Sequence, residues 1–250
     1  MRIAVFFTPV GLTPSDVARK PVLVVDVLRA TTTMIAALAH GARRIVPAAS
    51  PGEAIRVAQG MAPEEVVLAG ERGCRPIEGF RLGNSPREMT ADAVAGQTIV
   101  MATTNGTPAL TAAERGNPVL VGAITNFSAM VVRARTAFEE RGEIVILCSG
   151  RERRFALEDA YVAGRFVRAL APEAGLREAA LDDAGIAALQ LVQRYGDRWK
   201  RAVQASAAAR LLTQLGYQED VAVATEMDTH SIVPVYAERR VTASVPPGEP

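Results

Sequence analysis

The sequence predicts an α/β fold, in which a mostly parallel or mixed sheet is flanked by helices as a three-layer sandwich. Short runs of β-branched residues recur along the chain and alternate with segments of helical periodicity, an order typical of α/β proteins. The runs are continuously apolar, which indicates strands buried on both faces and favours parallel pairing. No linker interrupts this order, so we expect a single structural unit over residues 1–250.

The strands expected in the first part of the chain are apolar runs of ordinary strand length. Each is bounded by Gly, Pro or polar residues, which tend to end a strand. These strands are Arg2–Phe7, Val22–Val27, Arg44–Ala48, Val66–Ala69, Thr98–Ala102, Val119–Gly122 and Glu143–Cys148.

Helices are expected between these strands. The clearest runs from about Asn126 to Arg141, where Phe127, Met130 and Phe138 share one face and Gly142 supplies the stop. Further helices are expected over Pro51–Gln59 and from Asn105, where proline follows in the first turn.

The pattern changes after Leu157, where longer helical segments precede a final group of strands. The expected helices are Leu157–Leu170, Leu181–Tyr195 and Trp199–Leu215, and the expected strands are Asp220–Thr225, Ile232–Tyr236 and Arg239–Val245. The Pro- and Gly-rich tail at 246–250 is expected to fray.

The composition indicates a globular protein without a strong charge of either sign. Lys and Arg number 28 against 27 Asp and Glu, so the chain lacks the basic field that attracts nucleic acids or membrane surfaces. Its apolar runs are far shorter than the roughly 20 residues of a membrane-spanning helix. Two cysteines suggest no disulfide framework. We therefore expect a cytoplasmic protein that binds neither nucleic acid nor membrane.

Polar segments follow several of the expected strands. In an open parallel sheet, ligands bind beyond the carboxyl ends of the strands, so these segments are expected to form the site. They are DVLRATTT, GERGCRP, TTNGTP, ITNFS and CSGRERRFALED. Motifs of P-loop enzymes, dinucleotide-binding proteins, zinc proteases and serine hydrolases do not occur in the sequence.

The segment DVLRATTT combines an acid, a base and three threonines. Thr31, Thr32 and Thr33 suit the first turn of a helix, where hydroxyls and free N–H groups bind an anion such as phosphate. Asp26 would serve there as a magnesium ligand or as a nucleophile towards phosphorus, and Arg29 as a clamp on the anion. The structural alternative is a threonine cap with Asp26 paired to Arg29.

Hydroxyl, amide and glycine residues open other expected helices. An ordinary cap or turn explains each of them alone, but several at one edge of a sheet favour a binding site. The residues concerned are Asn84, Ser85, Thr104, Asn105, Gly106, Thr107 and Asn126, and in the last loop Ser149 and Gly150.

Acidic residues at the same edge fit a divalent cation. Mg²⁺ takes few carboxylates and keeps waters, so Asp26, Glu71 and either Glu158 or Asp159 would suffice. The alternative for Glu158 and Asp159 is the favourable acidic first turn of a helix. Arginines in these loops either neutralise a phosphorylated ligand or are simply solvated. They are Arg72, Arg151, Arg153 and Arg154.

Four segments, VVDVLRATTT, GERGCRPIEGFRLGNSP, TTNGTPAL and LEDAYVAG, occur in the order found in the 2-phosphosulfolactate phosphatase family, which the chain resembles. The likeness continues through RLLTQLGYQEDVAVATEMDTHSIVPVY and so extends over nearly the whole chain. The resemblance implies an unusual α/β fold and a Mg²⁺-dependent phosphatase that converts 2-phospho-3-sulfolactate to 3-sulfolactate and phosphate, a step towards coenzyme M. Arg81 and Cys74 depart from the family pattern, where an acid and a glycine-like position are usual.

On these grounds the candidate residues fall into three groups. The candidate catalytic residues are Asp26, Arg29, Glu71, Arg72 and Asp159, and the candidate ligands of the Mg²⁺ cofactor are Asp26, Glu71 and Glu158. The candidate substrate-binding residues are Thr31, Thr32, Thr33, Asn84, Ser85, Thr104, Asn105, Gly106, Thr107, Asn126, Ser149, Gly150 and Arg154.

The sequence leaves several alternatives open. Either water attacks phosphorus in line, or Asp26 attacks it to form an aspartyl-phosphate. A noncatalytic protein that binds small anions would use the same helix starts, and a related phosphatase would act on a different small anionic phosphate ester. A homo-oligomer is expected only from the general frequency of symmetric assemblies.

Overall fold

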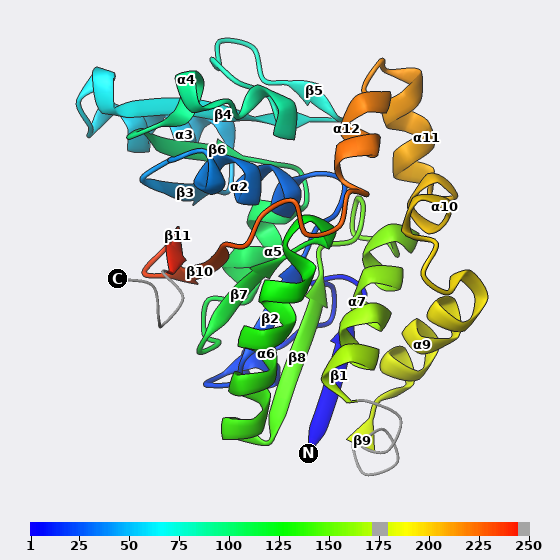
Figure 1. Ribbon diagram of the computed structural model, residues 1–250. Helices are drawn as coiled ribbons and strands as arrows, with labels where there is room; N and C mark the ends of the chain where they lie inside the picture. The colour runs from blue at the N-terminus through cyan, green and yellow to red at the C-terminus, as the bar shows by residue number, and fades with distance from the viewer. Residues whose placement is uncertain (172–179, 245–250) are drawn as a thin grey trace.

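The computed structural model describes residues 1–171 and 180–244 of the chain. Its strands form one mixed sheet of eleven strands in the order β5-β4-β6-β3-β11-β10-β7-β2-β8-β1-β9, with helices on both sides (Figure 1). The predicted α/β class is therefore confirmed. The expected fraying at 246–250 lies outside the described residues.

The bounds of the elements are as follows. The strands are β1 Arg2–Phe6, β2 Val22–Val25, β3 Arg44–Ala48, β4 Val66–Arg72, β5 Arg75–Pro76, β6 Thr98–Ala102, β7 Val119–Gly122, β8 Glu143–Cys148, β9 Ala180–Leu181, β10 Val233–Ala237 and β11 Arg240–Ser244. The α-helices are α1 Pro14–Val17, α2 Ala30–Ala39, α3 Pro51–Gln59, α4 Ala91–Val94, α5 Gly106–Ala112, α6 Phe127–Arg141, α7 Leu157–Leu170, α9 Asp183–Tyr195, α10 Trp199–Gln204, α11 Ala207–Gln214 and α12 Gln218–Val223. Short 3₁₀ helices are η1 Pro63–Glu65, η2 Pro86–Glu88 and η3 Ile124–Asn126.

The sheet consists of two mostly parallel parts joined by an antiparallel hairpin. Strands β7, β2, β8, β1 and β9 are parallel and form what we call the β2 part. Strands β3, β6 and β4 are parallel and, with the short antiparallel β5, form the β3 part. The hairpin β10–β11 pairs with β7 on one side and with β3 on the other, so the last strands of the chain occupy the middle of the sheet.

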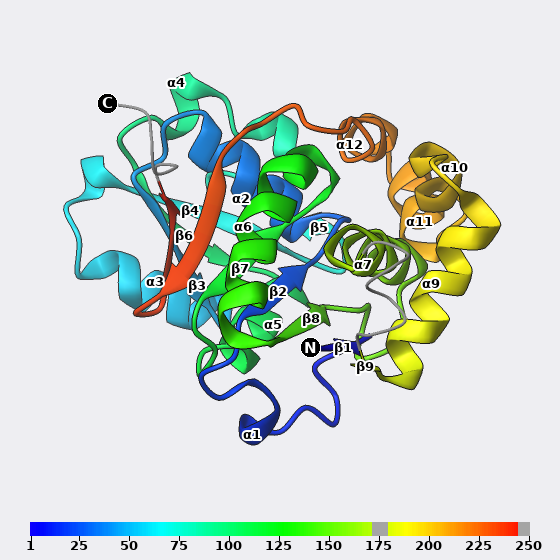
Figure 2. The same ribbon diagram turned by 60° about the horizontal axis from the view of Figure 1, so that its bottom comes forward.

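The central strands are buried on both faces, as their continuous apolar runs predict. In β2, Leu23 and Val25 pack in a core with helices α6 and α7, whereas Val22 and Val24 pack in a second core. Helices α6, α7 and α9 cover the first of these faces (Figure 2). The second core includes α2 and α5 and strands of both parts of the sheet, and so it connects the two parts.

Two crossover helices lead the chain from one part of the sheet to the other. Helix α2 follows β2 and leads to β3, and α5 follows β6 and leads to β7. Their first residues lie side by side, because a Cβ placed on Gly106 would be 2.3 Å from the Cβ of Ala30. The carboxyl ends of β2 and β6 therefore meet at a switch point between the two parts, the position where open α/β sheets bind ligands.

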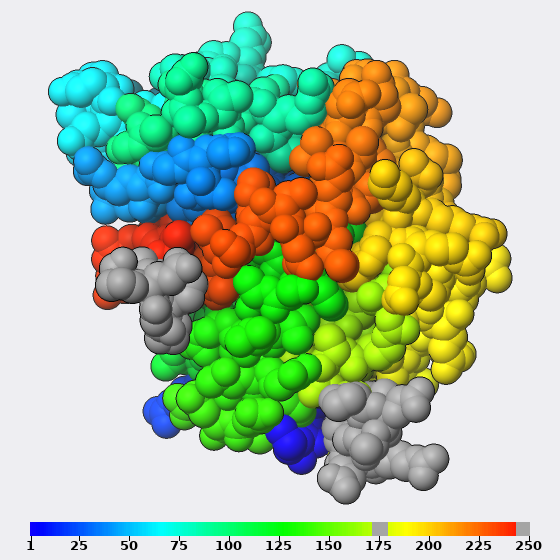
Figure 3. Space-filling view, viewed as in Figure 1, coloured from blue at the N-terminus to red at the C-terminus, as the bar shows by residue number. Residues whose placement is uncertain are grey.

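Two expectations for the C-terminal segment are wrong. Residues Asp220–Thr225 do not form a strand, because Gln218–Val223 is helix α12 with Asp220 buried in its first turn. The single helix expected over Trp199–Leu215 is two helices, since Ser206 accepts a hydrogen bond from the Ala209 N–H at 3.0 Å and so caps α11. Figure 3 shows the residues of α12 and of the segment that follows it, in orange, lying between the blue and teal residues above and the green residues below.

A helix that crosses a membrane must be both long and apolar. Within residues 1–171 and 180–244, no helix has both the length and the apolar character needed to cross a membrane.

Candidate active site

A pocket lies at the switch point, where loops from both parts of the sheet meet. Its walls come from the end of β4, from the loops after β2, β4, β5, β6 and β8, and from the first turns of α7 and α11. The lining residues are Asp26, Leu28, Arg29, Glu71, Cys74, Asn84, Thr103, Asn105, Gly150, Arg151, Glu158, Asp159 and Ala208. The structure thus brings Asp26 and Glu71 into one pocket, although β2 and β4 belong to different parts of the sheet.

Asp26 follows the last residue of β2 and is buried at 5% exposure. Its Oδ1 accepts a hydrogen bond from the Ala30 N–H at 3.1 Å, and its backbone is held by the Thr31 side chain. Burial raises the pKa of Asp26 to about 6, the neighbouring Glu71 acts in the same direction, and Ser149, the Ala30 N–H and Arg29 act against it. The carboxylate is therefore fixed in place with its charge incompletely compensated.

Asp26 belongs to a group of three buried carboxyls. Glu158 and Asp159, at the start of α7, are 3% and 2% exposed. Burial raises the pKa of Glu158 to about 7, and Asp26 adds to the effect. Burial also raises the pKa of Asp159 well above its usual value, with Asp26 and Glu158 contributing. Such a group holds protons near neutral pH unless a cation offsets its charge.

The raised pKa of Glu158 predicts a pH-dependent stability difference. Below pH 4.5 the carboxyl is protonated in both states, but between about pH 4.5 and 7 the folded state holds the proton that the unfolded state releases. Stability from this group therefore falls as pH rises through that window. With EDTA present, Glu158→Gln should be more stable than the natural chain by a few kcal/mol at pH 8 and by clearly less at pH 5. Urea denaturation of both proteins at both pH values measures this, and an equal difference at the two pH values would contradict it.

Asp159 connects two of the site's loops. Its Oδ1 accepts a hydrogen bond from the Val27 N–H at 2.9 Å, and its Oδ2 accepts one from the Gly150 N–H at 3.1 Å and one from the Ser149 hydroxyl at 3.3 Å. Ser149 and Gly150, which the sequence proposes as substrate-binding residues, thus form hydrogen bonds with Asp159 in this structure. The arrangement holds the loops after β2 and β8 together beside Asp26.

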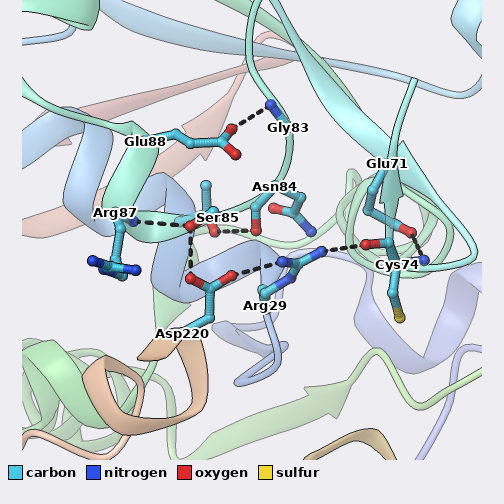
Figure 4. A network of polar contacts seen from close by, with 10 residues as sticks. Arg29, Glu71, Cys74, Gly83, Asn84, Ser85, Arg87, Glu88 and Asp220 are labelled. Atoms are coloured by element: carbon cyan, nitrogen blue, oxygen red, sulfur yellow. Dashed lines mark hydrogen bonds and ion pairs between the residues drawn. The ribbon is translucent and has the colours of Figure 1, made fainter. Parts of the chain in front are cut away.

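Arg29 also lines the pocket, and its guanidinium group lies between Asp220 and Cys74, which bind it from opposite sides (Figure 4). It forms an ion pair with Asp220 of α12 at 2.6 Å, donates to the Cys74 carbonyl at 2.9 Å, and lies 4.5 Å from the centre of the Tyr217 ring. Asp220 in turn accepts a hydrogen bond from the Ser85 hydroxyl at 2.7 Å. Asp220 thus sets the orientation of Arg29, and the sequence interpretation did not include it.

Glu71 holds two loops in the β3 part of the site. Its Oε1 accepts a hydrogen bond from the Thr104 N–H at 2.6 Å, and its Oε2 accepts one from the Cys74 N–H at 2.8 Å. The Thr104 hydroxyl donates to the same Oε2 at 3.1 Å. Both oxygens of Glu71 are therefore engaged, which favours a positioning role for Glu71 over a metal ligand.

The Asn84 side chain has a buried oxygen for which the described residues provide no hydrogen-bond partner. The residue is 5% exposed and lines the pocket, and its Oδ1 makes no hydrogen bond among the described residues. Its backbone carbonyl accepts a hydrogen bond from the Thr33 hydroxyl at 3.0 Å, which fixes the loop on α2. A buried amide oxygen without a partner is costly, so this atom marks a place for a cation or for a donor on a ligand.

Gly106 brings the two crossover helices into contact beside Asp26. A Cβ at this position would lie 2.3 Å from the Cβ of Ala30 and 2.9 Å from Oδ2 of Asp26. Gly106→Ala is therefore expected to force α2 and α5 apart and to lower the free energy of unfolding by about 1–3 kcal/mol. Chemical denaturation measures the change.

Gly52→Ala is the matched control for this prediction. Nothing lies within 4 Å of a Cβ at Gly52, so the added methyl group meets open space and improves helix propensity in α3. Equal stability changes in the two variants would show that the contact between the helices is not tight.

Several candidate residues form hydrogen bonds that hold the loops around the pocket in place. The Thr31 hydroxyl bonds the Asp26 backbone, the Thr32 hydroxyl donates to the Val27 carbonyl, and Thr107 exchanges hydrogen bonds with Thr103. Asn105 lines the pocket and accepts a hydrogen bond from the Glu152 N–H at 2.9 Å. The three threonines after Arg29 are thus buried supports of the loop, and they are absent from the pocket lining.

Other candidates lie away from the pocket. Asn126 is fully buried, and its amide bonds the Ala123 N–H and the Ile232 carbonyl, so it ties η3 to the C-terminal segment. Arg72 donates to the carbonyls of Glu71 and Ala49. Arg154 is exposed on the loop after β8 and is absent from the lining, whereas Arg151 of the same loop belongs to it.

Fold and site together define an α/β protein in which loops from two parts of one sheet enclose buried carboxylates, a guanidinium group and an unpartnered amide oxygen. Comparison with known proteins gives the family. A family model described as 2-phosphosulpholactate phosphatase matches residues 6–239, and the chain belongs to this family.

Relatives match over almost their whole length. A protein of Symbiobacterium thermophilum is 35% identical over 93% of this chain and 98% of its own length. Proteins of Deinococcus radiodurans and Thermus thermophilus are 37% and 41% identical, over 94% and 86% of this chain and 92% and 86% of their own lengths. All three are named probable 2-phosphosulfolactate phosphatase.

Proposed function

We propose that this protein is a phosphatase that hydrolyses 2-phospho-3-sulfolactate, or a closely related phosphorylated organic acid, to 3-sulfolactate and phosphate. The observation that supports the proposal most strongly is the pocket itself. It places the buried carboxyls of Asp26, Glu158 and Asp159 beside the cationic Arg29 and Arg151. Membership of the family supplies the substrate class.

The proposal includes Mg²⁺ as cofactor, and the donor atoms of the pocket fit this ion. Among the described residues, no three His, Cys, Asp or Glu side chains form a ready metal cluster. Mg²⁺ does not need one, because it keeps several waters and takes only one or two carboxylates. Asp26 and Glu158 would hold it together with the Asn84 Oδ1, whose lack of a partner suits a ligand role. When bound, Mg²⁺ supplies positive charge that offsets these carboxylates and the phosphate oxygens.

The side chains of the chain have separate tasks in this proposal. Arg29, fixed by Asp220 and Tyr217, directs its charge at the phosphoryl group without moving during the reaction. Asp26, fixed by the Ala30 N–H, either takes a proton from the attacking water or attacks phosphorus itself. Glu71 and Asp159 position the surrounding loops through the hydrogen bonds described above.

A screen of phosphate monoesters tests the proposal. Purified protein is incubated with 2-phosphosulfolactate, 2-phospholactate, phosphoenolpyruvate and simple alkyl phosphates, with Mg²⁺ or with EDTA, and released phosphate is measured. We expect release from 2-phosphosulfolactate with Mg²⁺ and a loss of activity with EDTA that added Mg²⁺ restores. Stoichiometric binding without release in any condition would instead identify a noncatalytic anion-binding protein. Full activity in EDTA would contradict the cofactor.

The proposal also extends to the pathway, the cellular location and the oligomeric state of the protein. We propose that the reaction, which forms 3-sulfolactate, is a step towards coenzyme M, and that the protein is located in the cytoplasm. Sedimentation of the purified protein determines whether it forms a homo-oligomer.

A further inference from the structure

A second hollow opens beside the active-site pocket, between the loop after β8 and the start of α11. It has a volume of about 230 Å³. Its walls include Arg151, Phe155, Glu158, Ala208 and Arg210. Arg151, Glu158 and Ala208 also line the active-site pocket, so the two spaces share a wall and lie next to each other.

The hollow carries two guanidinium groups at its walls. Among the described residues, the Arg151 side chain has only a weak ion-pair partner, Glu152, at 4.0 Å, and the Glu152 side chain is 68% exposed. Arg210 is exposed and donates one N–H to the Ala205 carbonyl at 2.7 Å, which leaves most of its five donors for a ligand. Glu158 is the single carboxylate that the part of the chain described by the structure contributes to this lining, so cationic groups outnumber anionic ones there.

The remaining walls are small or apolar and are held in place. Ser206 caps α11 through its hydrogen bond from the Ala209 N–H. Phe155 packs edge-on against Phe7 with ring centroids 5.2 Å apart, which anchors the loop that carries Arg151. The two segments that carry Arg151 and Arg210 are therefore held in place on either side of the hollow.

A third hollow, which adjoins the active-site pocket at Asn105, is the main alternative for binding the rest of the substrate. It is lined by Thr104, Asn105 and Arg153, with apolar residues of the loop after β1. It shares only Asn105 with the active-site pocket and offers one arginine. A short substrate whose phosphate lies near Asp26 therefore reaches more positive charge through the hollow at Arg151 and Arg210.

We propose that the hollow between the β8 loop and α11 binds the second acidic group of the substrate, a carboxylate or a sulfonate, with Arg151 and Arg210 as its specificity-determining residues. This inference rests on the proposed function, because it concerns the nonphosphorylated end of the same substrate. In this proposal the hollow favours substrates that carry a second acidic group over simple phosphate esters. The site at Asp26 performs the same hydrolysis on both kinds of substrate.

The test compares Arg210→Ala with two controls that also remove an exposed arginine. Arg201→Ala removes one on α10 outside the hollow, and Arg153→Ala removes the one in the competing hollow. For Arg210→Ala we expect KM for 2-phosphosulfolactate to rise about 10- to 100-fold, the effect of losing a charge-assisted hydrogen bond. For ethyl phosphate the change in kcat/KM should be less than about 3-fold, and both controls should resemble the natural protein.

A third substrate distinguishes the acidic groups. With 2-phospholactate, which lacks the sulfonate, a retained effect of Arg210→Ala shows that the carboxylate binds in the hollow, and a lost effect shows that the sulfonate does. An equal loss on all three substrates, or an effect confined to Arg153→Ala, overturns the proposal.

Calorimetry separates this inference from the proposed function. If the natural protein hydrolyses none of the esters, the proposed function fails, but binding of 3-sulfolactate is still measurable. Weaker binding to Arg210→Ala than to Arg201→Ala then supports the anionic hollow, and equal binding to both variants, or no binding to the natural protein, overturns it.

Discussion

Asp26→Asn is expected to lower kcat for phosphate release from 2-phosphosulfolactate by at least about 1,000-fold, the scale seen when a principal catalytic group is removed. In the proposed site, Asp26 is a ligand of the cation and also the group that activates water or attacks phosphorus. Asparagine keeps the shape and still accepts the hydrogen bond from the Ala30 N–H, but it carries no negative charge. The loss therefore reports the charge rather than a change in the loop.

Stability measurements separate this effect from unfolding. Burial raises the pKa of Asp26 to about 6, so its ionised form is costly in the metal-free folded protein at pH 8. A neutral asparagine should leave the melting temperature unchanged or raise it under chelation. Asp92→Asn, at an exposed position in α4, is the control and should match the natural protein in both assays. An active Asp26→Asn protein would refute the role.

Isotope labelling and trapping together distinguish the two routes. After many turnovers in H₂¹⁸O, label enters the Asp26 carboxylate only if an aspartyl-phosphate is hydrolysed at its carboxyl carbon. Direct attack by water, and hydrolysis of an aspartyl-phosphate at phosphorus, both leave the carboxylate unlabelled, so trapping with a metallofluoride mimic completes the test. Label in the carboxylate, or a trapped Asp26 adduct, supports the covalent route.

The strands and the edge that carries the site follow directly from the sequence. Strands β3, β6, β7 and β8 have the predicted bounds, because buried parallel strands are short, continuously apolar and sharply ended by polar loops. The sharp change from an apolar strand to a polar loop also makes the loops after these strands easy to recognise in the sequence. Asp26 and Glu158 stand in such loops or just beyond them, and the structure places both in the pocket.

The sequence does not reveal which polar groups of these loops face the pocket. The three threonines after Arg29 look like an anion cradle, yet their hydroxyls complete backbone hydrogen bonds of neighbouring loops. Local pattern cannot distinguish the two, since either use places hydroxyls at the start of a helix. An unpartnered atom such as the Asn84 Oδ1 is likewise visible only in three dimensions.

The C-terminal segment shows a stronger limit. The run DVAVAT from Asp220 has the β-branched alternation of a strand, but tertiary contacts place it in helix α12. Glu219 and Asp220 in the first turn were a helix-start signal that the strand interpretation ignored. The pairing of Asp220 with Arg29 spans 191 residues of sequence, so no local pattern predicts it.

Asp220→Asn is expected to lower the free energy of unfolding by about 3–5 kcal/mol and to reduce activity as well. The Arg29 and Asp220 side chains are 3% and 2% exposed, so the substitution leaves a buried guanidinium charge without its anionic partner. Arg29 also loses the contact that directs it at the pocket, although the Cys74 carbonyl and the Tyr217 ring remain. Urea denaturation and phosphate release measure the two effects.

The ion pair between Arg165 and Asp197 is a matched control, because its N–O distance is also 2.6 Å but the Asp197 side chain is 76% exposed. Asp197→Asn should therefore cost only about 0–1 kcal/mol. Adding Arg29→Met to Asp220→Asn removes the unpaired charge, so the double variant should recover part of the lost stability while remaining inactive. Two results would contradict this explanation. One is that Asp220→Asn lowers the free energy of unfolding no more than Asp197→Asn does. The other is that the double variant is less stable than Asp220→Asn alone, so that the unpaired guanidinium charge is not the cause of the loss.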